Sequence, residues 1–427
     1  MKRDFLATLF AQAVSAANPY KALKPYLPPR PKGRTIVVGT GKGAAQMAAA
    51  FETLWQEAGN GALSGLVVTR YGYAVPCKQI EICEAAHPLP DDNGLAAATR
   101  LMETVSNLTK DDLVVALVCG GGSALLPLPP EGMTLADEIA LNKALLSSGA
   151  PIAAMNAIRK QFSRIKGGRL AARAYPAKVL TLAVSDIPGD EPSYISSGPT
   201  VPNNDGRKLA LDFITHYRIA LPARIMQFLH NNRDDTPKPD DTIFTGNHVQ
   251  IIASAAQSLL AAGTYARQQG RAACILSDCI EGQAKDIGAM HAAIAREISL
   301  RNQPFTKPVV LLSGGETTVT LNTDTGNGKG GKGGRNSEFL LSFALGIDGL
   351  AGISALAADT DGIDGSENNA GAFCDGATVS TMRQAGIDPA AHLFRHDAWT
   401  AFHAVDSLFV TGATGTNVND FRAVLIE

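Results

Sequence analysis

A glycine turn near the start of the chain contains the first residues that could do chemistry. The turn, GTGKGAAQ (Gly39–Gln46), follows an apolar run and fits the G-x-G-x-x-A form of dinucleotide-binding turns. Backbone N–H groups and the helix dipole favour an anion there, and Lys42 adds an ammonium group. Phosphoryl transfer commonly uses such a cation, whereas hydride transfer needs none. We therefore predict that Gly41, Lys42 and Gly43 bind phosphate; the alternative is a tight turn with a solvated lysine.

A second glycine turn, CGGGSALL (Cys119–Leu126), also follows an apolar run and leads into a helical pattern. It lacks the ending of a P-loop, but its backbone N–H groups could form a nest around an anion. Tight packing of a strand against a helix would also explain the glycines. The residues predicted to bind phosphate are Gly120, Gly121, Gly122 and Ser123.

Three carboxylates follow a further apolar run, in the segment SDIPGDEPSY. Asp186 and Asp190 could accept a proton from a substrate hydroxyl group or hold Mg²⁺, and the sequence leaves open which does which. Glu191 is expected to cap the turn that follows.

A glycine-rich loop in the last third of the chain, GKGGKGGRNSE (Gly328–Glu338), carries three cations. It misses the P-loop pattern by one position, because Gly333 stands where Ser or Thr would hold a metal. Lys329 and Lys332 suit a flap that closes on phosphate, and Arg335 could bind a carboxylate with both arms of its guanidinium group. An exposed loop without a ligand is the alternative.

Two polar turns come later in the chain. Asp361 lies in ADTDGIDGSENNAGAF, whose acids do not have EF-hand spacing, so we expect it to hold Mg²⁺ or to orient a lysine. Thr416 and Asn417 lie in TGATGTNVND and are predicted to bind phosphate.

These turns require a scaffold, and apolar runs alternating with helical stretches predict an α/β fold with a mostly parallel sheet. Strands ending in glycine or acid place the ligand crevice at their carboxyl ends. We expect two helices hinged at Ser147–Pro151, and two short strands around a turn at Gly314–Gly315. Residues 5–14 have the spacing of a packed amphipathic helix, although the segment also imitates a secretory signal. The polar segment Asn231–Asp241 is the best linker candidate, although a surface loop has the same composition.

The composition limits the partners. A chain of 427 residues predicts two domains, and 45% hydrophobic with 18% charged residues is typical of a globular protein. A net charge of −2 argues against nucleic acid or an acidic membrane as partner, and no apolar run reaches the ~20 residues of a membrane span. Six cysteines without zinc-ligand spacing favour a cytoplasmic setting. Whether the chain forms a homodimer is left open.

Taken in order, the motifs resemble the glycerate 2-kinase family, whose C-terminal half is called the MOFRL domain. The segments that carry the resemblance are GTGKGA, CGGGSALL, LLSSGAPI, RKQFSRIKGGRLA, SDIPGD, SSGPTVPN, SGGETTVT, GGRNSE, AADTDGIDG and TGTNVND.

The resemblance implies a Rossmann-like N-terminal domain (1–236), an α/β MOFRL domain (237–427) and an active cleft between them. It implies ATP- and Mg²⁺-dependent phosphorylation of D-glycerate at the 2-hydroxyl group, giving 2-phosphoglycerate. Lys42, Asp186 or Asp190, Arg335 and Asp361 match the family's catalytic positions. Arg335 would clamp the glycerate carboxylate, and further substrate contacts are expected from Ser148, Gly149, Arg159 and Lys160.

Two other functions compete with this one. An NAD(P)H-dependent hydroxypyruvate reductase could use the first glycine turn, but the acid expected at the end of the next strand is replaced by Thr69 and Arg70. Arg70 could in principle serve a 2′-phosphate. A sensor that only binds phosphorylated metabolites is disfavoured by the paired acids.

Overall fold

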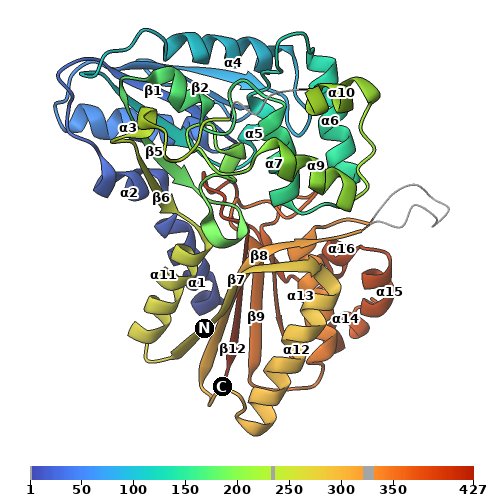
Figure 1. Cartoon of the computed structure of the whole chain (residues 1–427). Coiled ribbons are helices and arrows are strands. Elements are labelled where there is room, and N and C mark those ends of the chain that lie inside the picture. Colours follow the sequence, from blue (N-terminus) through green and yellow to red (C-terminus); the bar gives the residue numbers. More distant parts are fainter. Residues whose placement is uncertain (1, 232–235, 321–330) are drawn as a thin grey trace. The chain divides into compact units, whose positions relative to one another are not determined.

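The computed structural model describes residues 2–231, 236–320 and 331–427 (Figure 1). The chain forms two compact units. The N-terminal unit is Pro19–Ile252, and the C-terminal unit combines Met1–Asn18 with Ala253–Glu427. Compared with the predicted domain ranges, residues 237–252 belong with the N-terminal unit and the first helix belongs with the C-terminal unit.

A six-stranded sheet in the order β3-β2-β1-β4-β5-β6 forms the centre of the N-terminal unit. Strands β1 to β5 pair in parallel, which confirms the predicted α/β fold. The order is that of doubly wound sheets, and it reverses direction between β1 and β4. The strands are β1 (Thr35–Thr40), β2 (Ser64–Arg70), β3 (Ile80–Ala85), β4 (Leu113–Val118), β5 (Lys178–Val184) and β6 (His248–Ala253).

The helices of this unit include the predicted pair hinged after residue 147, α6 and α7. A third helix, α8, follows because Gly167 and Gly168 have φ of 64° and 82°, a left-handed conformation that a right-handed helix excludes. The helices are α2 (Pro19–Leu23), α3 (Ala44–Glu57), α4 (Asp92–Thr104), α5 (Gly122–Leu125), α6 (Leu135–Ser147), α7 (Ile152–Gln161), α8 (Arg169–Ala174), α9 (Arg207–His216) and α10 (Ala223–Asn231).

The predicted linker lies inside the N-terminal unit where the structure describes it; residues 232–235 are outside the described ranges. Thr236 is buried and accepts a hydrogen bond from Arg169 Nη2 at 3.2 Å. The described part of the segment is therefore a loop anchored to the unit's interior.

A mixed sheet in the order β11-β10-β9-β12-β8-β7 forms the centre of the C-terminal unit. Strand β12 is antiparallel to β8 and β9, and β7 is parallel to β8. The predicted turn at Gly314–Gly315 is wrong, because β8 continues through both glycines, which pair with Phe421 and Asp420. A Cβ atom at Gly315 would overlap the backbone of Ile280 in β7. The strands are β7 (Ala272–Gln283), β8 (Val309–Thr318), β9 (Ile353–Asp359), β10 (Gly371–Asp375), β11 (Leu408–Phe409) and β12 (Asp420–Ile426).

Helices pack on both faces of this second sheet. The predicted N-terminal helix, α1 (Lys2–Ala16), is confirmed: it buries Leu6, Leu9 and Phe10 in a core shared with α11 (Ala255–Gln268). Among the described residues, no helix combines the length and apolar character needed to span a bilayer. The other helices are α12 (Ala284–Arg301), α13 (Arg335–Gly346), α14 (Thr378–Gln384), α15 (Pro389–Phe394) and α16 (Ala398–His403).

Candidate active site

The first glycine turn follows β1, beside the point where the strand order reverses. Gly41 has φ of 131°, and a Cβ atom there would overlap the carbonyl oxygen of Cys119. The Lys42 N–H donates to Gly120 O at 2.9 Å, and Thr69 Oγ1 donates to Lys42 O at 3.1 Å. The Lys42 ammonium group makes no hydrogen bond or ion pair within the described ranges, so its charge is available to a ligand.

The second glycine turn follows β4, on the other side of the reversal. A Cβ atom at Gly120 would overlap the carboxylate of Asp186, which follows β5. A Cβ atom at Gly121 would lie 3.1 Å from Lys42 Cγ and 3.1 Å from His87 Nε2. The structure therefore brings Lys42, Asp186 and His87 to the same turn, and only glycine fits between them.

Ser123 is part of an internal hydrogen-bond network. Its hydroxyl oxygen lies 2.7 Å from Ser197 Oγ, and the Ser197 hydroxyl donates to Asn156 Oδ1 at 2.8 Å. Ser196 and Ser197 have φ of 53° and 60°, a left-handed conformation that is costly outside glycine and is often found at functional sites. Through this network, Ser123 links the second glycine turn to Ser197 and Asn156.

His87 was missed by the sequence interpretation, which assigned no histidine to the site. It follows β3 and is half-buried. Burial and the positive charges of Lys42, Arg70 and Arg159 lower its pKa from 6.5 to about 4. The imidazole is therefore neutral near pH 7. His87 could have been found as a polar residue that follows a strand, but that strand, β3, was not predicted from the sequence.

The two cations of α7 have different surroundings. Arg159 is half-buried and donates from Nε to Asn142 Oδ1 at 3.0 Å, and burial lowers its pKa to about 10 although Glu138 opposes this. Lys160 is 0% exposed and pairs with Asp205 at 3.1 Å. Lys160 is thus paired within the protein, and its substrate contact stays a prediction, whereas Arg159 lies near His87.

The other predicted residues of the N-terminal unit are in capping or turn positions. Ser148 ends α6, where its hydroxyl group donates to Leu145 O at 2.6 Å, and Gly149 is exposed with φ of 66°. Asp190 is half-buried with φ of 53°. Glu191 accepts the N–H of Ser193 at 3.1 Å, as expected of a turn-capping residue.

In the C-terminal unit, Arg335 begins α13 and is surrounded by acids. Nε donates to Asp420 at 2.7 Å, Nη1 to Glu316 at 2.8 Å and Nη2 to Asp359 at 2.9 Å. Burial alone would lower the pKa of Arg335, but these three carboxylates together raise it. The fork predicted to bind a substrate carboxylate is therefore occupied by the protein's own carboxylates.

The acids around Arg335 are themselves held in place. Asp420 is buried and accepts hydrogen bonds from Asn336 Nδ2 at 2.9 Å and from Thr317 N at 3.0 Å. Burial raises the pKa of Asp359, which Arg335 opposes. Asp364 accepts the backbone N–H groups of Asn336 and Ser337 at 2.9 and 2.7 Å, so a carboxylate of the chain already caps α13.

Asp361 and Asn417 lie beside this group of acids. The Asp361 N–H donates to Asp359 Oδ1 at 3.1 Å, and Asn417 Nδ2 donates to Asp361 Oδ2 at 3.5 Å. Thr416 is buried, and its N–H donates to Thr414 Oγ1 at 3.4 Å. These contacts bring Asp361, Asn417 and the acids around Arg335 into one region of the C-terminal unit.

The predicted flap is only partly described. Lys329 lies outside the described residues. Lys332 donates its N–H to Asp397 Oδ1 at 2.9 Å, and its ammonium group lies 4.8 Å from the ring centre of Trp399. Lys332 is thereby attached to the segment that begins α16.

The donors for a divalent cation are few. Over the described ranges, no group of three or more His, Cys, Asp or Glu residues could hold a metal ion. A magnesium ion that takes most of its ligands from phosphate and water needs only one or two carboxylates. Asp186, against the glycine turn beside Lys42, fits that requirement.

A doubly wound sheet with two glycine turns and an available lysine at its reversal point is the arrangement at which α/β proteins commonly bind anionic ligands. Two family models match the chain: the "Domain of unknown function (DUF4147)" over residues 5–230 and the "MOFRL family" over residues 309–420.

Curated relatives match almost the whole chain. The D-glycerate 2-kinase of Thermotoga maritima is 38% identical over 420 residues, covering 97% of this chain and 96% of that protein. The glycerate 2-kinase of Pyrococcus horikoshii is 36% identical over 442 residues, with 99% and 97% covered. An Agrobacterium vitis protein, provisionally named a hydroxypyruvate reductase, is 52% identical over 396 residues, with 92% and 100% covered.

Solved structures give the same result. The glycerate kinase crystal structure from Thermotoga maritima superposes with a TM-score of 0.88 at 35% identity and covers 99% of both chains. The chain therefore belongs to the glycerate 2-kinase family and has a MOFRL domain.

Proposed function

We propose that the protein is a glycerate 2-kinase, which transfers the γ-phosphoryl group of ATP to the 2-hydroxyl group of D-glycerate. The observation that carries the proposal is the available Lys42 ammonium group between two glycine turns, with the Asp186 carboxylate against the second turn. Positioning and charge neutralisation are what phosphoryl transfer requires of a protein. The relatives named as glycerate kinases support the choice of acceptor.

In the proposed mechanism, backbone N–H groups of both turns hold the phosphates of ATP, and Lys42 offsets negative charge on the migrating group. One of the two carboxylates, Asp186 or Asp190, orients the 2-hydroxyl group or takes its proton. Magnesium, when bound by the other carboxylate and the phosphates, would neutralise part of the phosphate charge.

The glycerate carboxylate needs its own cation, and Arg335 has three carboxylates around it. We propose that Arg159, with Arg70, supplies the positive surroundings instead, beside the neutral His87, since both arginines act electrostatically on that imidazole. Arg335 would then position Asp359 and Asp361. The active cleft between the two domains stays a prediction.

The reductase is the second candidate, because the 52% identical relative bears that provisional name. Arg70 ends β2, where a dinucleotide site would need an acid, and its guanidinium group lies 4.3 Å from the ring centre of Tyr73. This arrangement favours the kinase.

One pair of assays decides between the candidates. The protein is incubated with ATP, Mg²⁺ and D-glycerate, and phosphorus NMR identifies the phosphorylated carbon. In parallel, NADH and NADPH absorbance is followed with hydroxypyruvate. We expect 2-phosphoglycerate and no reduced-cofactor consumption; the reverse result would replace the kinase by the reductase. Binding of ATP without any turnover would favour the sensor.

A further inference from the structure

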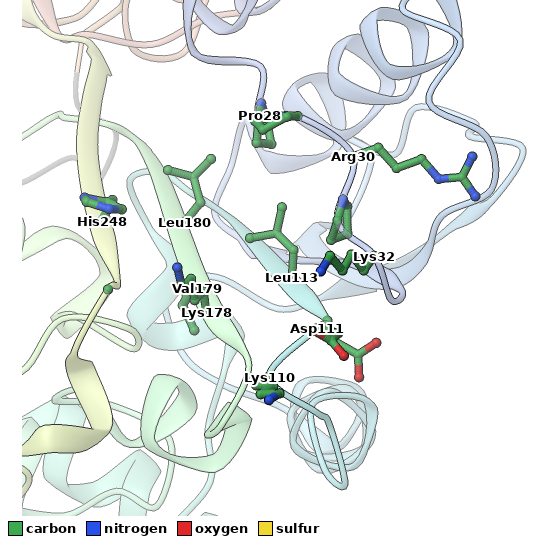
Figure 2. Close-up of a pocket in the computed structure, with 14 residues that line it drawn as sticks. Pro28, Arg30, Lys32, Lys110, Asp111, Leu113, Lys178, Val179, Leu180 and His248 are labelled. Carbon is green, nitrogen blue, oxygen red and sulfur yellow. The ribbon is translucent and has the colours of Figure 1, made fainter.

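A cavity of about 520 Å³ lies at the amino ends of strands β4, β5 and β6 (Figure 2). Lys42 follows the carboxyl end of β1, at the opposite end of the strands. The walls of the cavity include the first residues of three strands, Leu113 of β4, Lys178 of β5 and His248 of β6. The glycine turns follow the carboxyl ends of β1 and β4. Since a strand of six residues spans about 20 Å, this cavity is separate from the proposed phosphoryl-transfer site.

Cations dominate the charged lining of the cavity. Figure 2 shows Lys32, Lys110 and Lys178 around the same opening, whereas Arg30 extends away from it. Over the described ranges, none of the three lysine side chains makes a hydrogen bond or ion pair. Their positive charges are therefore not offset by the protein and are available to an anion.

The acids at this edge do not cancel that charge. Asp112 accepts Arg34 N at 2.6 Å and Arg34 Nη2 at 3.0 Å, and this arginine lowers the pKa of the Asp112 carboxyl group. Asp111 is the other acid of the lining, and three lysines stand against it. The cavity is thus locally positive in a chain whose net charge is −2.

The remaining walls are apolar and stiff. Leu113 and Leu180 form the strand side, where Val179 has its side chain in the hydrophobic core, and they face the segment Pro28–Lys32, which contains three prolines. Proline fixes its backbone angle, so this wall loses little freedom when a ligand binds. An inorganic anion would make no contact with the apolar walls. A long polyanion such as a nucleic acid would need an extended basic surface, and this cavity is bounded.

We propose that this cavity binds a nucleotide-sized organic phosphate, with the lysines on the phosphates and the proline and leucine side chains against the base. The site is distinct from the turns around Lys42. Its volume falls within the ~300–1,000 Å³ of small-molecule sites.

Calorimetric titration of the full-length protein with ADP tests the proposal. The double variant Lys32→Glu/Lys178→Glu should weaken one binding event at least about tenfold, whereas Lys42→Ala should leave that event unchanged. Lys208→Glu, which reverses one charge at an exposed position of α9, is a control for surface charge and should have no effect. Far-UV circular dichroism and the melting temperature confirm that each variant is folded.

This test can fail independently of the kinase proposal. ADP binding to the cavity is recognised by its loss of affinity in the Lys32→Glu/Lys178→Glu variant, and Lys42→Ala does not change it. Binding that is insensitive to the double variant, or equally sensitive to Lys208→Glu, would overturn the cavity site. Pyrophosphate, which has no base, should bind the cavity at least about tenfold more weakly than ADP; equal affinity would overturn the organic part of the proposal.

Discussion

Lys42 and Arg335 both belong to glycine-containing turns at the start of a helix, yet their surroundings are opposite. The Lys42 ammonium group has no partner within the described ranges, whereas the Arg335 guanidinium group contacts Asp420, Glu316 and Asp359 at 2.7 to 2.9 Å. A cation in a glycine turn is therefore not by itself an anion site. What decides is whether the fold brings carboxylates to it.

The topology explains the difference. Lys42 follows a strand of a parallel sheet, where the neighbouring turn, Gly120–Gly122, supplies N–H groups. Arg335 lies where β8 and β9 end and the antiparallel β12 begins, and each of these strands supplies one acid. The first arrangement leaves a charge for a ligand, and the second arrangement uses the charge to hold strand ends together.

Replacing Lys42 by alanine should give the largest effect. We expect kcat to fall about 10³-fold, as on removal of a cation that stabilises a phosphoryl-transfer transition state, with an unchanged melting temperature. The measurement is an ATP-coupled glycerate assay beside thermal unfolding, with Lys143→Ala on α6 as the control. A variant within about threefold of the wild-type rate would contradict the assigned role.

Replacing Arg335 by alanine should act mainly on stability. Removing one partner of a buried ion pair typically costs about 3–5 kcal/mol of unfolding free energy. Asp359 would stay buried without this counter-charge, whereas Asp420 keeps its ion pair with Arg422 and Glu316 is 51% exposed. Urea titration measures the loss, and Arg335→Lys, which keeps a charge but not the fork, should recover part of it. If instead stability holds and only the KM for glycerate rises, Arg335 is the carboxylate clamp that the sequence predicted.

His87 gives a pH test of the surroundings of Lys42. Its pKa is lowered from 6.5 to about 4, so the folded state binds this proton more weakly than the unfolded chain, and stability falls as pH drops from 6.5 to 4. His87→Gln should reduce the slope of unfolding free energy against pH in that range by up to about 1.4 kcal/mol per pH unit. Buried His291, whose pKa is also lowered to about 4, keeps a residual slope. A slope equal to that of the wild type would contradict the shifted pKa.

Lys332 should show the smallest effect. Its ammonium group is 56% exposed, lies 3.9 Å from Glu367 and stacks on Trp399, so it is already engaged at the surface. We expect Lys332→Ala to change the KM for ATP less than about threefold, since exposed ion pairs contribute little. A tenfold or larger increase, measured by initial rates over a range of ATP concentrations, would restore the predicted phosphate contact.

The sequence predicted the parts of the site that depend on local pattern. The strand–turn–helix units around Lys42 and Gly120 were identified because glycine placement and apolar runs are local signals. β3 was missed because its sequence, IEICEA, alternates acids with apolar residues, and His87 was missed with it.

Contacts between segments that are distant along the chain could not be predicted from the sequence. Lys160 pairs with Asp205, 45 positions later, and Arg335 pairs with Asp420, 85 positions later. No local periodicity predicts such pairs, so the available and the occupied cations could not be told apart before the fold was known.

The position of α1 has a consequence for synthesis on the ribosome. This helix is made before the elements that it packs against, α11 and β12, which end at residues 268 and 426. At roughly 5–20 residues per second, its apolar face waits about 13–50 s for α11 and about 20–80 s for β12. Until β12 is made, the apolar face of α1 is exposed on the nascent chain, which makes this helix a candidate binding site for a chaperone.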